Sequence, residues 1–130
     1  MKKVEILIVV DASGALSSSN LQDNVYLVDT NKYVGSGNEG QAELKTACKD
    51  EQLISWRVES ISPDNEVSIK GFIGQMIDQK ICVPTKQGIG SDVYWEGRIE
   101  SRGTGQTVQY SAILVLDGKE MNFDPFLVIS

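Results

Sequence analysis

Apolar residues alternate with polar ones in several segments, and this spacing constrains the fold of the chain more than any other feature. Residues 54–60, 67–73, 93–100 and 108–116 follow the alternation, whereas residues 4–10, 25–28 and 126–129 are short, almost continuous apolar runs. A side-chain period of two is typical of a β-strand with one buried face. Trp56 lies on the apolar face of its segment, so we expect it in the core. Only residues 43–50 show helical spacing, and a strand fits them equally well.

Glycine-containing turns separate these segments. Asp117-Gly118 is a strong hairpin signal, and residues 102–105 (Arg-Gly-Thr-Gly) join two alternating runs. The last third of the chain therefore predicts a meander of antiparallel strands. Short strands at regular spacing predict one all-β domain over residues 1–130. We expect an antiparallel β-sandwich of the jelly-roll or Greek-key kind, with little helix.

Two aromatic residues stand next to each other in the segment DVYWEGR, residues 92–98. Trp95 is in register with Val93 and Ile99, which predicts that it points into the core. Tyr94 is in the opposite register, together with the charged side chains of the segment. It is the better candidate for contact with a ligand unless the sheet ends there and Trp95 reaches its rim. Both rings can face the same way only if a bulge intervenes, and Gly97 is where one could form.

The charge of the chain limits its partners. Its formal net charge is −6, which disfavours binding to nucleic acid or to an anionic membrane, because both are negatively charged. The apolar run near the start is bracketed by Glu5 and Asp11, so it is shorter than the core of a secretion signal. We read it as the first strand of a cytoplasmic protein, with release by a route without a cleaved signal left open.

The chain contains no histidine, which removes the commonest general base and the usual transition-metal ligand. Its two cysteines, Cys48 and Cys82, match no zinc or redox spacing and are expected to be free, partly buried thiols unless the protein leaves the cell. We therefore expect no enzymatic activity, no catalytic residues, no cofactor and no metal.

Two stretches imitate known binding motifs. Residues 35–40, Gly-Ser-Gly-Asn-Glu-Gly, spell out the dinucleotide-binding pattern, but that motif needs a parallel strand before it and a helix after it. We interpret it as a polar loop. Residues 11–15, Asp-Ala-Ser-Gly-Ala, resemble the magnesium site of von Willebrand A-type domains, but Ala15 replaces a ligand. We expect a loop capped by Asp11.

An ordered set of short motifs resembles one bacterial family. The motifs are ILIVVDA near the start, NVYLVD at residues 24–29, ISWRVES at 54–60, YWEG at 94–97 and FDP at 123–125. Together they resemble the AidA/PixA family, often called inclusion body proteins, over nearly the full chain. The resemblance implies a β-sandwich without known catalysis, and dense intracellular inclusions in some members. At least some members are similar to lectins that bind galactose-type sugars.

Sugar binding needs an aromatic ring to stack on the sugar and polar groups to hydrogen-bond its hydroxyls. The segment around Tyr94 offers both, and Asp11 and Asn24 lie at strand ends where loops gather. Each of these side chains could equally belong to a solvated strand face. The candidate ligand-binding residues are Asp92, Tyr94, Trp95, Glu96, Arg98, Asp11 and Asn24.

Three functions remain open at this stage. A carbohydrate-binding module is the first, and a self-assembling storage or inclusion protein without a small-molecule ligand is the second. A hydrolase is a distant third. In either of the first two cases we expect a homo-oligomer, and a dimer above all, because residues 126–129 are apolar on both faces. Such a strand needs either a central place in a sheet or a partner.

Overall fold

Five strands form the first layer of the sandwich, in the order β2-β1-β4-β7-β6. The computed structural model describes all of residues 1–130. β1 pairs in parallel with β4, and the other three pairings in this sheet are antiparallel. The strands are β1 (Val4–Val10), β2 (Val25–Asp29), β4 (Leu53–Ser60), β6 (Thr85–Gln87) and β7 (Tyr94–Arg98).

The second layer consists of two three-stranded ladders, β10-β9-β5 and β3-β11-β8. They join end to end, because only Tyr110 separates β8 from β9 and only Asp124-Pro125 separates β10 from β11. Pro125 lacks an N–H, but its carbonyl accepts a hydrogen bond from the N–H of Tyr110 at 3.0 Å, which carries the pairing across the bend. The strands are β3 (Lys45–Cys48), β5 (Val67–Ile73), β8 (Gln106–Gln109), β9 (Ser111–Leu116), β10 (Lys119–Phe123) and β11 (Phe126–Ile129).

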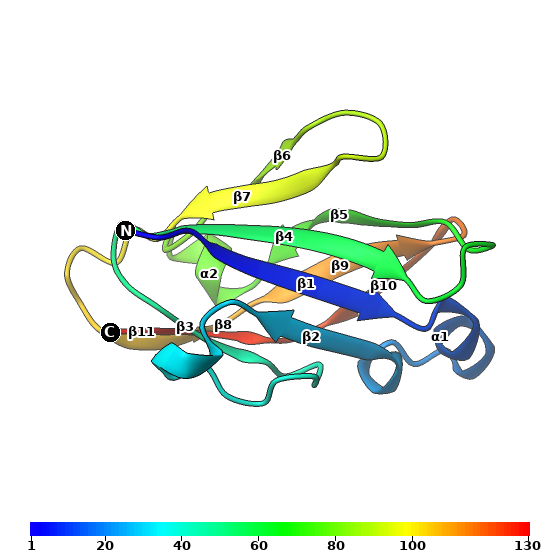
Figure 1. The fold of residues 1–130 in the computed structure, drawn as a ribbon, viewed down its shortest axis with the longest axis horizontal. Coiled ribbons are helices and arrows are strands. Elements are labelled where there is room, and N and C mark those ends of the chain that lie inside the picture. Colours follow the sequence, from blue (N-terminus) through cyan, green and yellow to red (C-terminus); the bar gives the residue numbers. More distant parts are fainter.

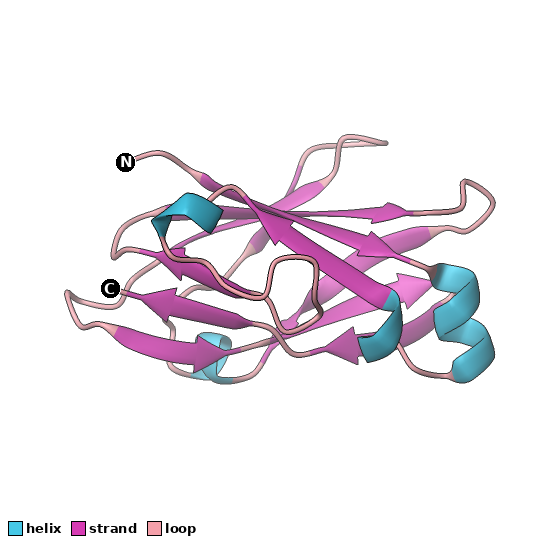
Figure 2. Ribbon diagram, turned by 60° about the horizontal axis from the view of Figure 1, so that its bottom comes forward, coloured by secondary structure: helices cyan, strands magenta, loops and turns pink.

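The helices are short and lie at the ends and edges of the sheets (Figures 1 and 2). None of them has the length and apolar character that a membrane-spanning helix requires. The segment that we expected to be a loop after Asp11 is the first of them. They are α1 (Ala12–Ser18), α2 (Gln75–Asp78) and the two 3-10 helices η1 (Gln22–Asn24) and η2 (Lys32–Val34).

Aromatic rings fill the centre of the sandwich. Trp56, on the first sheet, is fully buried, as its place in the alternating pattern predicts. Its ring lies 4.9 Å from the ring of Phe72 and 5.9 Å from that of Tyr110, both on the second layer. Phe72 also contacts Trp95, at 5.7 Å. The two layers are therefore joined by large side chains at the point where the second layer bends.

The predicted all-β sandwich with little helix is confirmed, and the Asp117-Gly118 turn does join β9 to β10. Two details of the pairing differ from the prediction. Two of the pairings are parallel, β1 with β4 and β3 with β11. The predicted meander is wrong at residues 102–105, because that turn carries the chain from β7 in the first sheet to β8 in the second. Residues 43–50 contain a strand, β3, rather than a helix.

A β-bulge in β5 changes which residues face the core. The alternating pattern predicts Gly71 and Ile73 on the same face as Ile69. In the structure the register with β9 shifts between Ile69 and Gly71. The extra residue turns Phe72 inward and leaves Ile73 half exposed. A period of two cannot reveal this shift, because Gly71 and Ile73 continue the apolar positions of the segment without a visible break.

The last strand has a central place in its sheet. β11 lies between β3 and β8, so the apolar segment at residues 126–129 is paired on both sides and gives no reason for a partner.

Cys48 and Cys82 are both free and buried, as expected. Burial raises the pKa of each thiol to about 12, which keeps both protonated at neutral pH.

Candidate functional site

Tyr94 and its charged neighbours lie together on the outer face of the first sheet, as the alternation predicts. The guanidinium of Arg57, from the adjacent strand β4, lies 4.9 Å from the centre of the Tyr94 ring. The same guanidinium pairs with Asp92 at 3.1 Å. Lys3 pairs with Glu96 at 3.1 Å and lies 5.5 Å from the Tyr94 ring. The carboxylates of Asp92 and Glu96 are thus paired with Arg57 and Lys3, two cations that were not among the predicted site residues.

These ion pairs hold the outer face together only loosely. The hydrogen bond from Lys3 to Glu96 raises the pKa of the Lys3 ammonium. Both pairs lie in contact with solvent, where screening and side-chain entropy reduce their effect on stability. The Tyr94 ring is half-buried and lies against the guanidinium of Arg57, so a ligand that stacks on that face must displace the guanidinium or share the ring with it.

Arg98, Asp11 and Asn24 do not join this cluster. Arg98 donates a hydrogen bond to the carbonyl of Glu51 at 3.1 Å, at the far end of β7. Asp11 caps α1, accepting a hydrogen bond from the N–H of Gly14 at 3.0 Å. The N–H of Asp11 donates to the carbonyl of Asn24, so these two residues do meet, but at the opposite end of the sheet. Their contacts are those of a helix cap and a turn.

Trp95 lies on the opposite face from Tyr94, and no bulge intervenes. The pairing of β4 with β7 runs without interruption through Gly97, which has no room for a side chain. A Cβ there would lie 2.6 Å from the sulfur of Cys82. The prediction that Trp95 points into the sandwich is therefore correct. It is only half-buried, however, because the two layers do not close over it.

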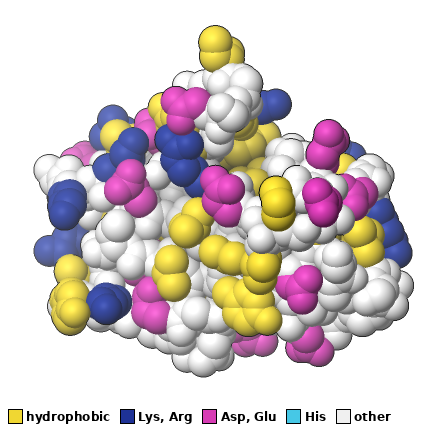
Figure 3. All heavy atoms as spheres, turned by 45° about the vertical axis from the view of Figure 1, so that its right-hand side comes forward, with side chains coloured by type: hydrophobic (Ala, Val, Ile, Leu, Met, Phe, Trp, Pro, Cys, Tyr) yellow, Lys and Arg dark blue, Asp and Glu magenta, His cyan; other side chains and the backbone are white.

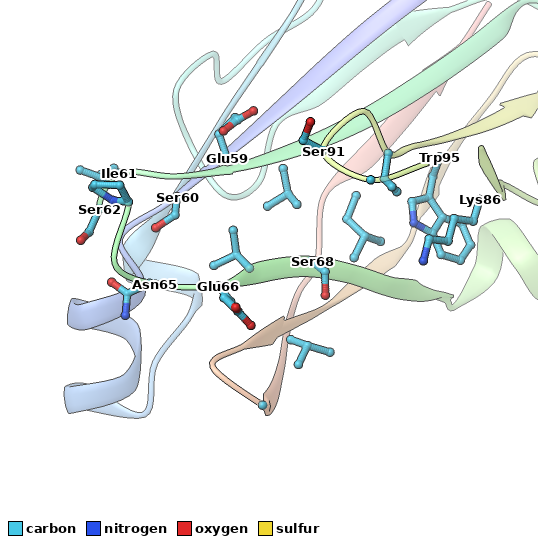
Figure 4. A pocket seen from close by; sticks show the side chains of 18 residues that line it. Glu59, Ser60, Ile61, Ser62, Asn65, Glu66, Ser68, Lys86, Ser91 and Trp95 are labelled. Carbon is cyan, nitrogen blue, oxygen red and sulfur yellow. The ribbon is translucent and has the colours of Figure 1, made fainter. Parts of the chain in front are cut away.

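The space beside Trp95 is a cleft of about 750 Å³ between the two layers. Its inner walls come from β4, β5 and β7, and the turn between β4 and β5 closes one end (Figure 4). This volume is within the range typical of ligand pockets. The apolar side chains that line it include Val58, Val67, Ile69, Val93 and Trp95.

Two buried polar atoms in this cleft have no hydrogen-bond partner: the indole Nε1 of Trp95 and the Oγ of Ser60. They lie towards opposite ends of the cleft in Figure 4. Trp95 pairs with Trp56, and the backbone of Ser60 lies four residues, about 13 Å, further along β4 than that of Trp56. Buried polar groups almost always find a partner, so these two shielded atoms are exceptions among the residues that line the cleft.

A patch of apolar side chains covers part of the outer face of the first sheet. Leu7 pairs with Val28 and Val9 with Tyr26, so the four form one contiguous group on β1 and β2, here called the outer patch. Tyr26 and Val28 are 45% and 42% exposed. The site predictions did not include the outer patch, although the sequence contains a signal for it. β1 is apolar at nearly every position, and such a strand has an apolar outer face as well as an inner one.

Comparison with known proteins supports the fold. The crystal structure of the inclusion body protein PixA from Burkholderia cenocepacia J2315 matches with a TM-score of 0.73 and 12% sequence identity, covering 99% of this chain and 95% of that chain. The resemblance to the AidA/PixA family is thus confirmed for the fold. No curated protein matches the sequence. Residues 2–122 match one family, and the chain belongs to it: the domain of unknown function DUF8788.

Proposed function

We propose that this protein is a non-enzymatic, self-assembling protein whose copies associate through the outer patch. The observation that carries the proposal is the exposure of Tyr26 and Val28 beside Leu7 and Val9 on a sheet face that no helix covers (Figure 1). Figure 3 shows apolar side chains gathered across the middle of the side that it presents. Contiguous apolar groups of this kind on a soluble protein are typical of association surfaces.

The border of the patch supports contact between two copies. Arg57 stands beside Leu7, and Glu59 beside Val9, on the neighbouring strand β4. A surface with both charges next to an apolar centre can be complementary to itself around a two-fold axis, which is the commonest symmetry of homo-oligomers. The similarity in fold to an inclusion body protein from Burkholderia cenocepacia agrees with assembly as the role.

The chemistry of the side chains supports a role without catalysis. The chain has no histidine to act as a general base. Both thiols have a pKa of about 12, far above the range in which a cysteine acts as a nucleophile at neutral pH. The carboxylates of Asp92 and Glu96 are engaged with Arg57 and Lys3.

Charge placed in the outer patch tests the proposal. Val28→Lys is compared with Val83→Lys, which puts the same charge at a site of similar exposure away from the patch. Light scattering across the micromolar range should give a lower average mass for Val28→Lys than for the wild type, and an unchanged mass for Val83→Lys. Equal masses for Val28→Lys and the wild type would contradict the proposal.

Carbohydrate binding is the second candidate function. The observation in its favour is that Tyr94, Asp92 and Glu96 share one face with Arg57 and Lys3, which places a ring next to charged hydrogen-bonding groups. Calorimetric titration with galactose tests it. If this face binds the sugar, Tyr94→Ala loses binding and keeps its melting temperature, whereas Trp95→Ala loses stability first. If no heat of binding is measured for the wild type with galactosides, fucosides or mannosides, the candidate fails.

A further inference from the structure

The loop between η2 and β3, residues 35–44, covers the unpaired edge of β2, the outermost strand of the first sheet (Figure 1). The N–H of Gly40 donates a hydrogen bond to the carbonyl of Leu27 at 2.6 Å. The side chain of Glu39 accepts a hydrogen bond from the N–H of Asp29 at 3.0 Å. These two bonds satisfy backbone groups that an edge strand otherwise leaves open to another strand.

The same loop is attached to β3 by contacts that do not involve Glu39. Gly37 and Lys45 exchange two backbone hydrogen bonds of 2.9 Å. The N–H of Ala47 donates a third, also of 2.9 Å, to the hydroxyl oxygen of Ser36. The loop therefore bridges the edges of the two layers, and its β2 side can separate while its β3 side stays paired.

One oxygen of Glu39 has no hydrogen-bond partner. Oε1 accepts the bond from the N–H of Asp29, whereas Oε2 is buried and accepts none. The neighbouring carboxylate of Asp29 already accepts hydrogen bonds at both oxygens, from the N–H of Asn31 and from the hydroxyl of the buried Thr46, each at 2.8 Å. Two ionised carboxylates side by side repel each other, whereas a carboxyl group and a carboxylate can share a proton.

The surroundings of this pair favour a proton on Glu39. Burial raises the pKa of Glu39, and the charge of Asp29 and a hydrogen bond between the two side chains raise it further, against the lowering effects of the Asp29 N–H and of Lys32. Asp29 also acts on the Cys48 thiol and the Tyr110 hydroxyl. Both of these stay neutral below pH 8, because the pKa of Cys48 is about 12 and that of Tyr110 is raised above its usual range.

We propose that Asp29 and Glu39 share one proton, and that this proton holds the loop of residues 35–44 against the edge of β2. The proton lies on Oε2 of Glu39, which thereby gains the partner that it lacks, and is donated to the carboxylate of Asp29. When the proton is lost, two negative charges face each other with Lys32 as the cation that acts on them, and the β2 side of the loop opens. The proposal does not depend on self-assembly through the outer patch.

The loop is closed in acid and opens as the pH rises. Because the pKa of Glu39 is raised in the closed loop, closure is most favourable below the ordinary value of about 4.3 and weakens as the pH rises from there through the raised value. Opening frees the carbonyl of Leu27 and the N–H of Asp29, so the edge of β2 becomes able to pair with another strand. The same strand carries Tyr26 and Val28 of the outer patch.

A carbon-13 NMR titration of the side-chain carboxyl groups tests the shared proton in the unmodified protein. Between pH 3 and pH 8, Glu39 should titrate with a midpoint above its ordinary value of about 4.3. In Asp29→Asn this midpoint should move down, because the repelling charge and the accepting carboxylate are both lost. A Glu39 midpoint at the ordinary value, or one that Asp29→Asn leaves unchanged, would overturn the proposal.

Hydrogen exchange measures the opening of the loop. The protection of the Asp29 and Gly40 amides, corrected for the intrinsic exchange rate, should fall between pH 4 and pH 8. The fall should be about tenfold for each unit by which the midpoint of Glu39 exceeds about 4.3. In Glu39→Gln the side-chain amide can donate to Asp29 at every pH, so the protection should stay constant.

Glu43→Gln is the matched control, because it makes the same change on an exposed side chain of the same loop. Its protection at Asp29 and Gly40 should fall with pH as it does in the wild type. If Glu39→Gln loses protection with rising pH as the wild type does, the proton of Glu39 does not hold the loop closed and the proposal is wrong.

Discussion

The indole Nε1 of Trp56 donates a hydrogen bond of 3.1 Å to the hydroxyl oxygen of Tyr110 in the centre of the sandwich. Both side chains are almost completely buried, and they come from different layers. Burial also raises the pKa of the Tyr110 hydroxyl well above its usual range, so the hydroxyl stays neutral. This contact fixes the first sheet against the bend in the second.

Removing the hydroxyl of Tyr110 should therefore be costly. In Tyr110→Phe the Nε1–H of Trp56 is left buried without a partner, which costs about 1–3 kcal/mol of the free energy of unfolding. Urea denaturation measures this value. The control is Tyr33→Phe. Because Tyr33 is 91% exposed, removing its hydroxyl should change the free energy of unfolding by less than about 0.5 kcal/mol. Equal effects of the two substitutions would contradict the buried contact.

Gly97 should not tolerate a methyl group. A Cβ at this position would lie 2.6 Å from the sulfur of Cys82 and 3.2 Å from the backbone of Pro84. Overpacking of this kind costs about 1–3 kcal/mol, so Gly97→Ala should lower the free energy of unfolding by that amount. At Gly37 the same substitution meets nothing within 4 Å, and Gly37→Ala should be close to neutral. If thermal melts show no difference between the two, β7 does not pass as close to Cys82 as the structure shows.

Both thiols should resist modification in the folded protein. Burial raises the pKa of Cys48 and Cys82 to about 12, so almost no thiolate forms at pH 8. A disulfide reagent such as Ellman's should react with neither thiol in buffer and with both in 6 M guanidinium chloride, as followed by absorbance. Rapid reaction of either thiol in buffer, at the rate seen in denaturant, would mean that it is accessible and ionises in the folded state.

Acid should weaken the turn at Asp117. Its carboxylate accepts hydrogen bonds from the N–H of Glu66 and from Asn65, and the bond from Glu66 lowers the pKa of Asp117. A lowered folded-state pKa gives stability that is present above the unfolded value of about 3.9 and is lost as the pH falls through the folded value.

Asp117→Asn isolates this effect, because asparagine also tolerates the positive φ of 46° at this position. The free energy of unfolding should differ between the wild type and Asp117→Asn by a constant amount from pH 7 to about pH 5, and the difference should shrink towards pH 2. A difference that does not change with pH would show that the carboxylate charge has no part in the contact.

The sequence predicts the strands well because alternation is a local property. Residues 54–60 become part of β4 with Trp56 inside, and Tyr94 and Trp95 lie on opposite faces as their positions require. The bulge that turns Phe72 inward is invisible to the pattern. It depends on the pairing of β5 with β9, in which the register shifts between Ile69 and Gly71.

The candidate surfaces are harder to predict, because they depend on how the layers are placed. Trp95 reads as an ordinary core residue, and only the splaying of β6 and β7 away from β5 makes it the wall of a cleft. Arg57 reaches Tyr94 because β4 pairs with β7, a pairing between strands that are far apart in the sequence. The apolar outer face of β1, by contrast, was visible in its continuous run of apolar residues.

Sedimentation equilibrium of the unmodified protein tests the central claim, self-assembly, most directly. Samples are compared at several concentrations from one to several hundred micromolar, at neutral pH and moderate salt. If copies associate through the outer patch, the average mass rises with concentration from 14.2 kDa towards twice that value. A mass that stays at 14.2 kDa at every concentration would contradict the account.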